Sequence, residues 1–218
     1  MTKNNRFNTL KRLIFYFGGF FVTAAGITTI LRSTLGAGAW DTVNSNLHEA
    51  TGITLGTASM VINITLLLII ILYHREKKFF FAFIPIIAIG LFIDLWDQVI
   101  YDSFAIETFP VRILFYFAGT FLLTTGLSLT IVSGYPAMVF DELTIILMRV
   151  FKTESFFKSR LFIELFAIFL ASIIGFTAGI GFGAVNVGSF ILAVILPPIL
   201  DREIKLIRPI VPFEPRNT

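Results

Sequence analysis

The sequence predicts an all-helical membrane protein made of two related halves, and three observations support this fold class. Hydrophobic residues make up 56% of the 218 residues and charged residues only 14%, a balance far from that of soluble domains. Six apolar runs are close to the roughly 20 residues that a helix needs to cross a hydrocarbon core of about 30 Å. The third observation is a repeat that relates residues 12–41 to residues 112–141.

The six apolar runs are the predicted membrane-spanning segments. Backbone polar groups in lipid must be satisfied within a segment, which favours helices over strands for runs of this length. The predicted spans are residues 13–31, 55–73, 79–100, 113–132, 161–180 and 184–200.

The repeat holds without a gap at an offset of 100 residues. Ten of its thirty positions are identical, and Arg, Tyr, Gly and Asp are among them, so shared hydrophobicity does not explain the match. The chain therefore contains two halves of one design, with three predicted spans each. The identical pairs are Arg12/Arg112, Phe15/Phe115, Tyr16/Tyr116, Phe17/Phe117, Gly19/Gly119, Phe21/Phe121, Gly26/Gly126, Ser33/Ser133, Ala37/Ala137 and Asp41/Asp141.

The basic residues predict the side of the membrane on which each loop lies, because cytoplasmic loops are enriched in Lys and Arg. With a cytoplasmic N-terminus, fifteen of the 17 Lys and Arg residues fall in inner segments, and only Arg32 and Arg112 fall outside. Three crossings per half then turn the second half upside down relative to the first. In transporters, such inverted repeats hold a substrate site near the midplane where the halves meet.

The predicted segments follow from the spans and the repeat. Residues 1–100 form the first three-helix repeat, and residues 101–111 form an outer loop. Residues 112–200 form the second three-helix repeat, and residues 201–218 form an extended, polar cytoplasmic tail that contains three prolines.

A short amphipathic helix is predicted after the first span of each half. In the first half it begins near Ala39, with Trp40 on its apolar face and Asp41 and Asn44 on its polar face. Its counterpart, within residues 136–151, carries Asp141. Two interpretations stay open. The helices lie in the membrane interface, with Trp40 among the headgroups, or they are re-entrant half-helices whose N-termini approach the midplane from opposite sides.

Polar groups in or beside these apolar segments are the candidate substrate-binding residues. An acid at the centre of a spanning helix costs about 2.5–3.5 kcal/mol on insertion scales and less near an end, so an intramembrane acid is a functional candidate. Asp94 lies about two turns from the outer end of the third span, and the alternative for it is an interfacial acid beside a belt tryptophan. The candidates are Asp41, Asn44, Asp94, Asp141 and Asn186.

Other conspicuous residues have structural explanations. Gly19 and Gly26 lie two turns apart on one helical face, and the fourth span repeats this spacing, which favours close packing between helices in lipid. Glu164 follows Arg160 by one helical turn, which predicts a local ion pair.

Several function classes are disfavoured by composition. Cysteine is absent, which excludes disulfides and thiolate chemistry, and the two histidines form no helical metal pair. No catalytic motif occurs in the spans, so we expect no enzyme activity, no cofactor and no metal site. The net charge of +3 comes from clusters beside the spans, which membrane orientation explains without nucleic-acid binding.

Two stretches carry a resemblance to a known family. The sequence GAGAWD at residues 36–41, followed by TGITLGT at residues 51–57, resembles the YczE/YyaS/YitT family of bacterial integral membrane proteins. Residues 179–191 are similar to the Gly-x-Gly, Asn and Gly pattern that precedes the last span in that family. Ala39 departs from the proline that the family often has before the Trp-Asp pair. The resemblance implies a multi-pass protein of the bacterial cytoplasmic membrane, and the topology places both termini in the cytoplasm.

We expect a small transporter or channel-like protein from the inverted repeat and the paired acids Asp41 and Asp141. The alternative is an accessory membrane protein that scaffolds or regulates a partner, without transport activity. The expected partners are the lipid bilayer, a small solute or ion, and a membrane protein partner or a second copy of the chain.

Overall fold

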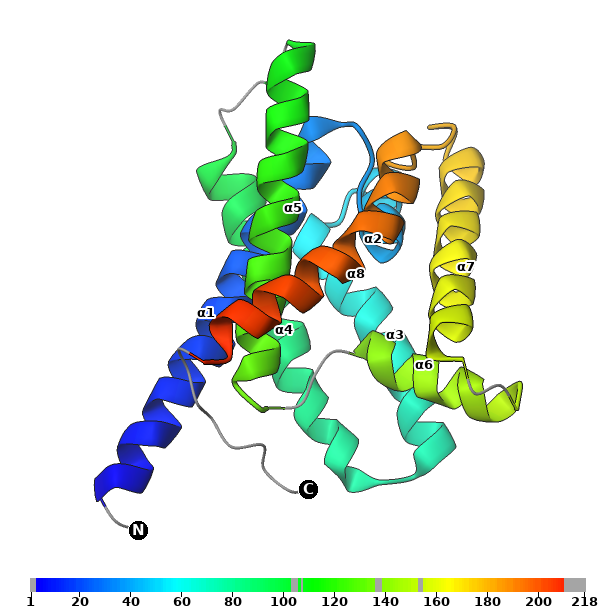
Figure 1. Ribbon diagram of the computed structural model, residues 1–218. Coiled ribbons are helices and arrows are strands. Elements are labelled where there is room, and N and C mark those ends of the chain that lie inside the picture. Colours follow the sequence, from blue (N-terminus) through cyan, green and yellow to red (C-terminus); the bar gives the residue numbers. More distant parts are fainter. Residues whose placement is uncertain (1–2, 103–105, 107, 136–138, 153–154, 210–218) are drawn as a thin grey trace.

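The computed structural model describes residues 3–102, 106, 108–135, 139–152 and 155–209, and this part of the chain contains helices and no strand. The helices are distributed over one bundle, with the N-terminal half of α1 extending beyond it (Figure 1). In chain order they are α1 (Lys3–Ser33), α2 (Ala39–Thr51), α3 (Leu55–His74), the 3-10 turn η1 (Lys77–Ala82), α4 (Phe83–Asp94), the π-helical turn η2 (Leu95–Ile100), α5 (Phe109–Val132), α6 (Val139–Val150), α7 (Phe156–Thr177) and α8 (Val187–Ile207).

Five of these segments are long and apolar enough to cross a membrane. They are Thr9–Ser33, Leu55–His74, Phe79–Ile100, Phe109–Val132 and Lys158–Thr177, and they match the first five predicted spans. The sixth predicted span lies in α8, where only the residues from Val187 to Leu200 precede the charged group that begins at Asp201. Because that apolar part is short and charges follow at once, α8 is not among these segments, although the whole helix is 21 residues long.

The most extensive contact between helices is the crossing of α1 and α5. The two helices run antiparallel, since Gly19 lies against Gly126 and Gly26 lies against Gly119. A Cβ atom on Gly26 would overlap the backbone of Leu123, so the helix backbones themselves are in contact. Small residues allow this approach in lipid, where dispersion and not hydrophobicity holds helices together. The glycine faces that the repeat predicts to pack therefore pack against each other.

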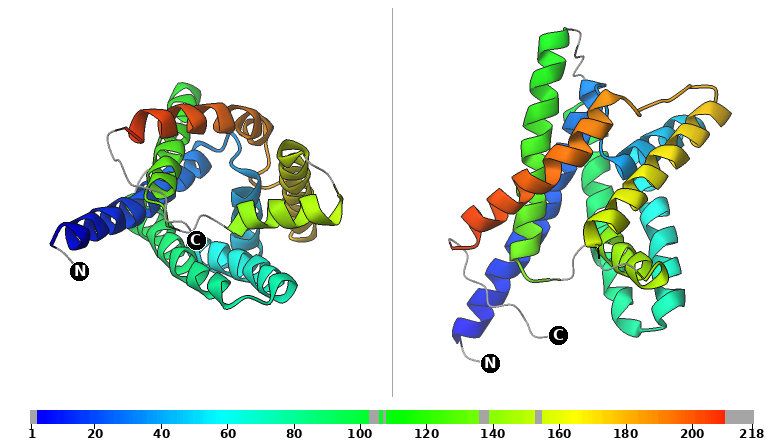
Figure 2. Two further views of the ribbon diagram at one scale, coloured as in Figure 1. Left: turned by 60° about the horizontal axis from the view of Figure 1, so that its bottom comes forward. Right: turned by 45° about the vertical axis from the view of Figure 1, so that its right-hand side comes forward.

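Two of the remaining helices pack on this crossing, and the others pack mainly on one another. Helix α4 packs against α1, and α8 packs against α5. Helix α2 packs against α3 and α7, while α6 also packs against α3 and α7. Figure 2 shows α8 inclined across α5 and separated from the end of α7 that adjoins α6.

The first turns of α2 and α6 meet inside the protein. Trp40 stacks on Phe140, its counterpart in the repeat, with ring centroids 5.1 Å apart and an angle of 25° between the planes. Trp40 is only 6% exposed. A headgroup anchor needs an exposed ring at the interface, so the anchoring role that the interfacial interpretation gave to Trp40 is wrong.

The structure of the chain beyond the last predicted span also differs from the prediction. Helix α8 continues to Ile207, so the prediction of an extended tail from Asp201 is wrong as far as the helix reaches. Glu203 in this added part is 8% exposed, and it accepts hydrogen bonds from Thr125 and Ser128 of α5. Helical periodicity carries Glu203 onto the face of α8 that packs on α5, which explains the extension.

The glycine contact predicts a contrast between two positions of α1. Gly26→Ala places a methyl group against the α5 backbone and should lower stability by about 1–3 kcal/mol, the usual range for overpacking. Gly18→Ala is the matched control, because its Cβ meets no atom within 4 Å. Thermal unfolding in detergent should show a lower Tm for Gly26→Ala and an unchanged or higher Tm for Gly18→Ala. Equal Tm values for the two variants would contradict the close crossing.

Candidate functional site

A cavity of about 320 Å³ lies between the two halves of the chain. Residues from α1 to α8 line it, and most of its wall is apolar. A volume of this size is at the small end of the roughly 300–1,000 Å³ typical of ligand pockets. The lining residues with hydroxyl, amide or charged side chains are Thr23, Asp41, Asn44, Ser59, Asn63, Arg160 and Glu164.

The N-terminal turn of α2 brings the polar side of this cavity into place. Gly38, Trp40, Asp41 and Asn44 all line it. The turn enters the bundle from a short loop after α1, where Gly36 adopts a φ of 114° that favours glycine. Asp41 and Asn44 are three residues apart, so one face of α2 presents both side chains to the cavity.

The loop before α2 is held by the first turn of α8. The amide of Gly188 donates to the carbonyl of Leu35 at 2.8 Å, and the amide of Ala37 donates to Oγ of Ser189 at 3.1 Å. The hydroxyl of Tyr116 on α5 donates to the carbonyl of Gly188 at 2.6 Å. These bonds couple the start of α2 to α5 and α8 of the other half.

Asn46 fixes the opposite side of α2. Its side chain is fully buried and its amide donates to the carbonyls of Ala171 and Phe182, at 2.8 and 3.1 Å. Its Oδ1 accepts from the amide of Ala184 at 2.8 Å. All the hydrogen-bonding groups of this buried amide are thus used for joining α2 to α7 and to the loop before α8, which leaves Asn46 a structural role.

Asp41 is the unbalanced charge of the cavity. Within the described residues its side chain makes no hydrogen bond and no ion pair, whereas Glu164 pairs with Arg160 at 2.9 Å between Nε and Oε1. The predicted ion pair is therefore confirmed. Helix α2 is not one of the spanning segments, and burial raises the pKa of Asp41 from its ordinary value to about 7, with the nearby negative Glu164 adding to the rise.

Three buried polar atoms in the cavity wall lack hydrogen-bond partners among the described residues. They are Oγ1 of Thr23, Nε1 of Trp40 and Oδ1 of Asn44, from side chains that are 1%, 6% and 4% exposed. Leaving a buried polar group unpaired costs about 1–3 kcal/mol, so such groups are rare in native proteins. Oγ1 of Thr23 faces α5 at Gly126, and three further atoms of this kind, on His74, Arg112 and Ser159, belong to residues that do not line the cavity. Trp40 and Asn44 are the residues with unpartnered atoms on the same turn of α2 as Asp41.

The sequence candidates divide between this cavity and other places. Asp41 and Asn44 line it. The side chain of Asp141 lies outside the part of the chain that the structure describes, although its neighbours Val139 and Phe140 line the cavity.

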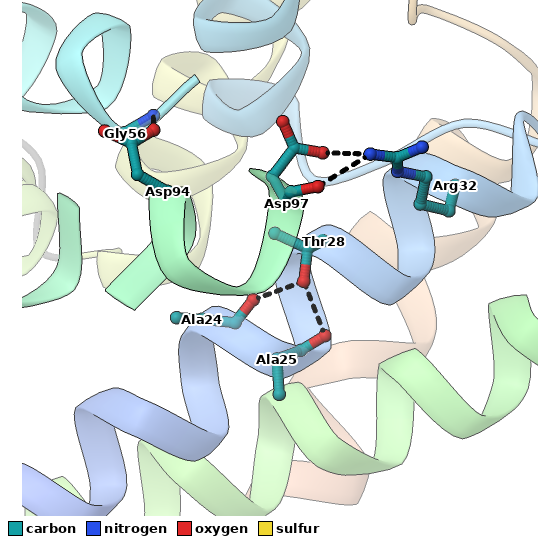
Figure 3. A network of polar contacts seen from close by, with 7 residues as sticks. All are labelled: Ala24, Ala25, Thr28, Arg32, Gly56, Asp94 and Asp97. Atoms are coloured by element: carbon teal, nitrogen blue, oxygen red, sulfur yellow. Dashed lines mark hydrogen bonds and ion pairs between the residues drawn. The ribbon is translucent and has the colours of Figure 1, made fainter. Parts of the chain in front are cut away.

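Asp94 and Asn186 have structural partners away from the cavity. Asp94 accepts hydrogen bonds from the hydroxyl of Thr54 and the amide of Gly56, both at 2.7 Å, and so caps the start of α3 from the end of α4 (Figure 3). Asn186 caps α8 by accepting from the amide of Val187 at 2.8 Å, and it donates to the carbonyl of Thr34. Neither residue lines the cavity.

A second acid near Asp94 is also bonded. Asp97 of η2 forms an ion pair with Arg32 of α1 at 2.8 Å, and Arg32 also donates to the Asp97 carbonyl at 2.9 Å (Figure 3). The two carboxylates of this region therefore join neighbouring helices.

Sequence reasoning missed part of the cavity wall. Thr23, Ser59 and Glu164 belong to it, and each sits in a span whose sequence is apolar overall. The polar side of one span can be recognised from sequence, but which other span it faces depends on packing. The described residues contain no group of three His, Asp or Glu side chains that could hold a metal ion.

A family comparison covers nearly the whole chain. Residues 10–202 match the profile of DUF6198, a family of unknown function. The chain belongs to the DUF6198 family. It is similar to the uncharacterized protein YyaS of Bacillus subtilis (strain 168), with 25% identity over 192 residues that cover 86% of this chain and 94% of YyaS.

A second relative identifies the class of protein. The uncharacterized membrane protein YczE of the same organism is 27% identical over 137 residues, which cover 62% of each chain. The predicted resemblance to the YczE and YyaS proteins is thus confirmed, and this DUF6198 member is a multi-pass membrane protein. No solved structure matches the chain significantly.

The environment of Asp41 predicts a pH dependence of stability. Its pKa of about 7 in the folded protein exceeds the value of about 3.9 expected for an unfolded chain, so the folded state binds more protons between these values. Stability should fall as pH rises from about 4 to about 7 and then level off. Asp41→Asn removes the carboxyl group and with it this loss of folding stability at high pH. The Tm of the variant should therefore exceed that of the wild type by more at pH 8 than at pH 5.

The control for this measurement is Asp201→Asn, because the Asp201 side chain is 62% exposed and lies far along α8. It should shift Tm equally little at both pH values. An Asp41→Asn variant with the same Tm difference at pH 5 and pH 8 would contradict a carboxyl group that is protonated on folding.

Proposed function

We propose that this protein is a small transporter or channel-like protein, and that the cavity is its substrate site. The observation that carries the proposal is a cavity between the two halves whose wall contains an acid without a cationic partner, Asp41, beside Trp40 and Asn44, each with an unpartnered buried polar atom. A protein that serves only as a scaffold gains nothing from such groups, which cost stability. The site needs a solute to complete its bonding.

The proposal includes six spans arranged as an inverted repeat, with α8 as the sixth span. Equivalent positions of the halves exchange contacts in support of it: Gly19 meets Gly126 as Gly119 meets Gly26, and Trp40 stacks on Phe140. Helix α8 lies on α5 as α4 lies on α1. A two-fold axis through the α1/α5 crossing would produce these pairings.

The short helices α2 and α6 act in this proposal as re-entrant half-helices. Their first turns line the cavity from two sides, through residues 38–41 and through Val139 and Phe140. Half-helices whose N-termini meet near the midplane are a recurring feature of transporter substrate sites. The buried Trp40/Phe140 stack favours this interpretation over helices that lie flat on the membrane surface.

One polar contact joins the two halves near an end of α1. Nε of Arg12 donates to the carbonyl of Ser133, directly after α5, at 2.8 Å. Rocking one half against the other around the glycine crossing would open this contact and expose the cavity to that side of the membrane.

Single-cysteine labelling tests the six-span topology, and the absence of native cysteine makes the background clean. Six spans place Glu76→Cys and Asp201→Cys on the same face of the membrane and Ile106→Cys on the other. An impermeant maleimide added to intact cells should label Ile106→Cys alone. Labelling of Asp201→Cys together with Ile106→Cys would show that α8 does not cross.

Solute movement tests the function itself. Proteoliposomes loaded with a bacterial metabolite extract should release at least one solute faster than protein-free liposomes, and Asp41→Asn should abolish that release while Asp201→Asn retains it. Mass spectrometry of the external medium identifies the solute. Release that does not differ from empty liposomes would overturn the proposal, and a stoichiometric co-purified partner would then favour the accessory role.

A further inference from the structure

The charges in the cavity wall define the sign of a ligand. The described lining contains two carboxylates and one guanidinium, and Arg160 is already paired with Glu164. Asp41 remains without a compensating cation. A buried ion without a partner is strongly disfavoured, so a ligand that brings one positive charge to Asp41 completes the site electrostatically.

The unpartnered atoms define the kind of cation. Oδ1 of Asn44 is a hydrogen-bond acceptor without a partner among the described residues. Pro197 has no amide hydrogen, so the carbonyl of Ala193, four residues earlier in α8, has no helical donor, and both residues line the cavity. Acceptors near an acid suit an ammonium group that carries N–H donors better than a quaternary ammonium, which has none.

The rest of the wall defines the body of the ligand. Seventeen of the 24 lining residues have no hydroxyl, amide or charged side-chain group, and they include Leu123, Leu127, Leu192 and Leu196. A bare inorganic cation would leave this apolar surface without a partner. The stacked rings of Trp40 and Phe140 belong to the same wall. The cavity therefore fits a small molecule with one charged end and an apolar remainder.

We propose that the cavity binds a small amphipathic organic cation, a primary or secondary ammonium with an apolar body, with its nitrogen at Asp41 and Asn44 and its apolar part against α5 and α8. This inference rests on the proposed function, because it names the substrate class of the same site. Asp41 and Asn44 lie on α2, and the leucines of α5 and α8 that would contact the apolar part belong to the other half of the chain. Binding thus joins the two halves.

Binding in detergent tests the inference independently of transport. The Trp96→Phe background leaves Trp40 as the single tryptophan, and its fluorescence reports the cavity. The probes are n-hexylammonium, hexyltrimethylammonium, hexanoate and hexan-1-ol. We expect saturable binding of n-hexylammonium, with at least about tenfold weaker binding of the other three, because each lacks the N–H cation.

Variants assign the binding to the cavity. Asp41→Asn should weaken n-hexylammonium binding by at least about tenfold, and Asn44→Leu by about threefold to tenfold, while Asp201→Asn should leave it unchanged. The Tm of each variant shows that it is folded. Tighter binding of hexanoate, or unchanged binding of n-hexylammonium to folded Asp41→Asn, would overturn the inference.

The two proposals fail in different ways. If n-hexylammonium binds in detergent but proteoliposomes release no solute, the transport function is wrong and the cation site stands. If proteoliposomes release a solute in an Asp41-dependent manner but n-hexylammonium does not bind, the substrate class is wrong and the transport function stands.

Discussion

The backbone contact between α1 and α5 is the constraint on which the rest of the structure depends. Lipid provides no hydrophobic force that would bring two helices together, so the contact needs backbones close enough for dispersion to act over a long interface. Four glycines allow this approach. Hydroxyl groups beside the crossing bond to carbonyls of their own helix, as Thr124 and Thr130 do on α5. The crossing therefore contains no polar group that lacks a partner apart from Thr23 at the cavity, among the residues the structure describes.

The crossing also decides where the cavity forms. Once α1 and α5 are fixed antiparallel, their following segments leave from opposite ends and turn back toward the middle as α2 and α6. The first turn of α2 is then held by Gly188 and Ser189 of α8, and its far side by the buried amide of Asn46. Groups more than 120 residues apart in the chain thus hold one short helix. Such long-range bonds leave the N-terminus of α2 little freedom, which suits a binding site.

The polar groups of the cavity differ from the other polar groups near apolar segments in their hydrogen bonding. Asp94, Asp97 and Asn186 are also polar and lie near apolar segments, but each has hydrogen-bond partners that stabilise the fold. Asp41 and Asn44 differ because the described protein does not complete their bonding. Polar groups that lack partners within the protein are common at functional sites. This contrast is the basis on which Asp41 and Asn44 are proposed as site residues.

The sequence by itself determined the helical class, the positions of five spans, the glycine faces that pack and the Arg160–Glu164 pair. Each of these depends on periodicity or short spacing, which local sequence records. Family membership likewise followed from short motifs. The sequence also placed Asp41 and Asn44 on one face of a short helix, because three residues make nearly one turn.

Only the tertiary structure decided what that face meets. Asp94 has a capping role because the end of α4 lies beside the start of α3, and no local pattern records that neighbour. The charged end of α8 continues as a helix because Glu203 reaches hydroxyl groups on α5. Thr23 and Glu164 join Asp41 at one cavity because α1, α2 and α7 converge there. Convergence is a property of packing between segments, and the pattern within a segment does not contain it.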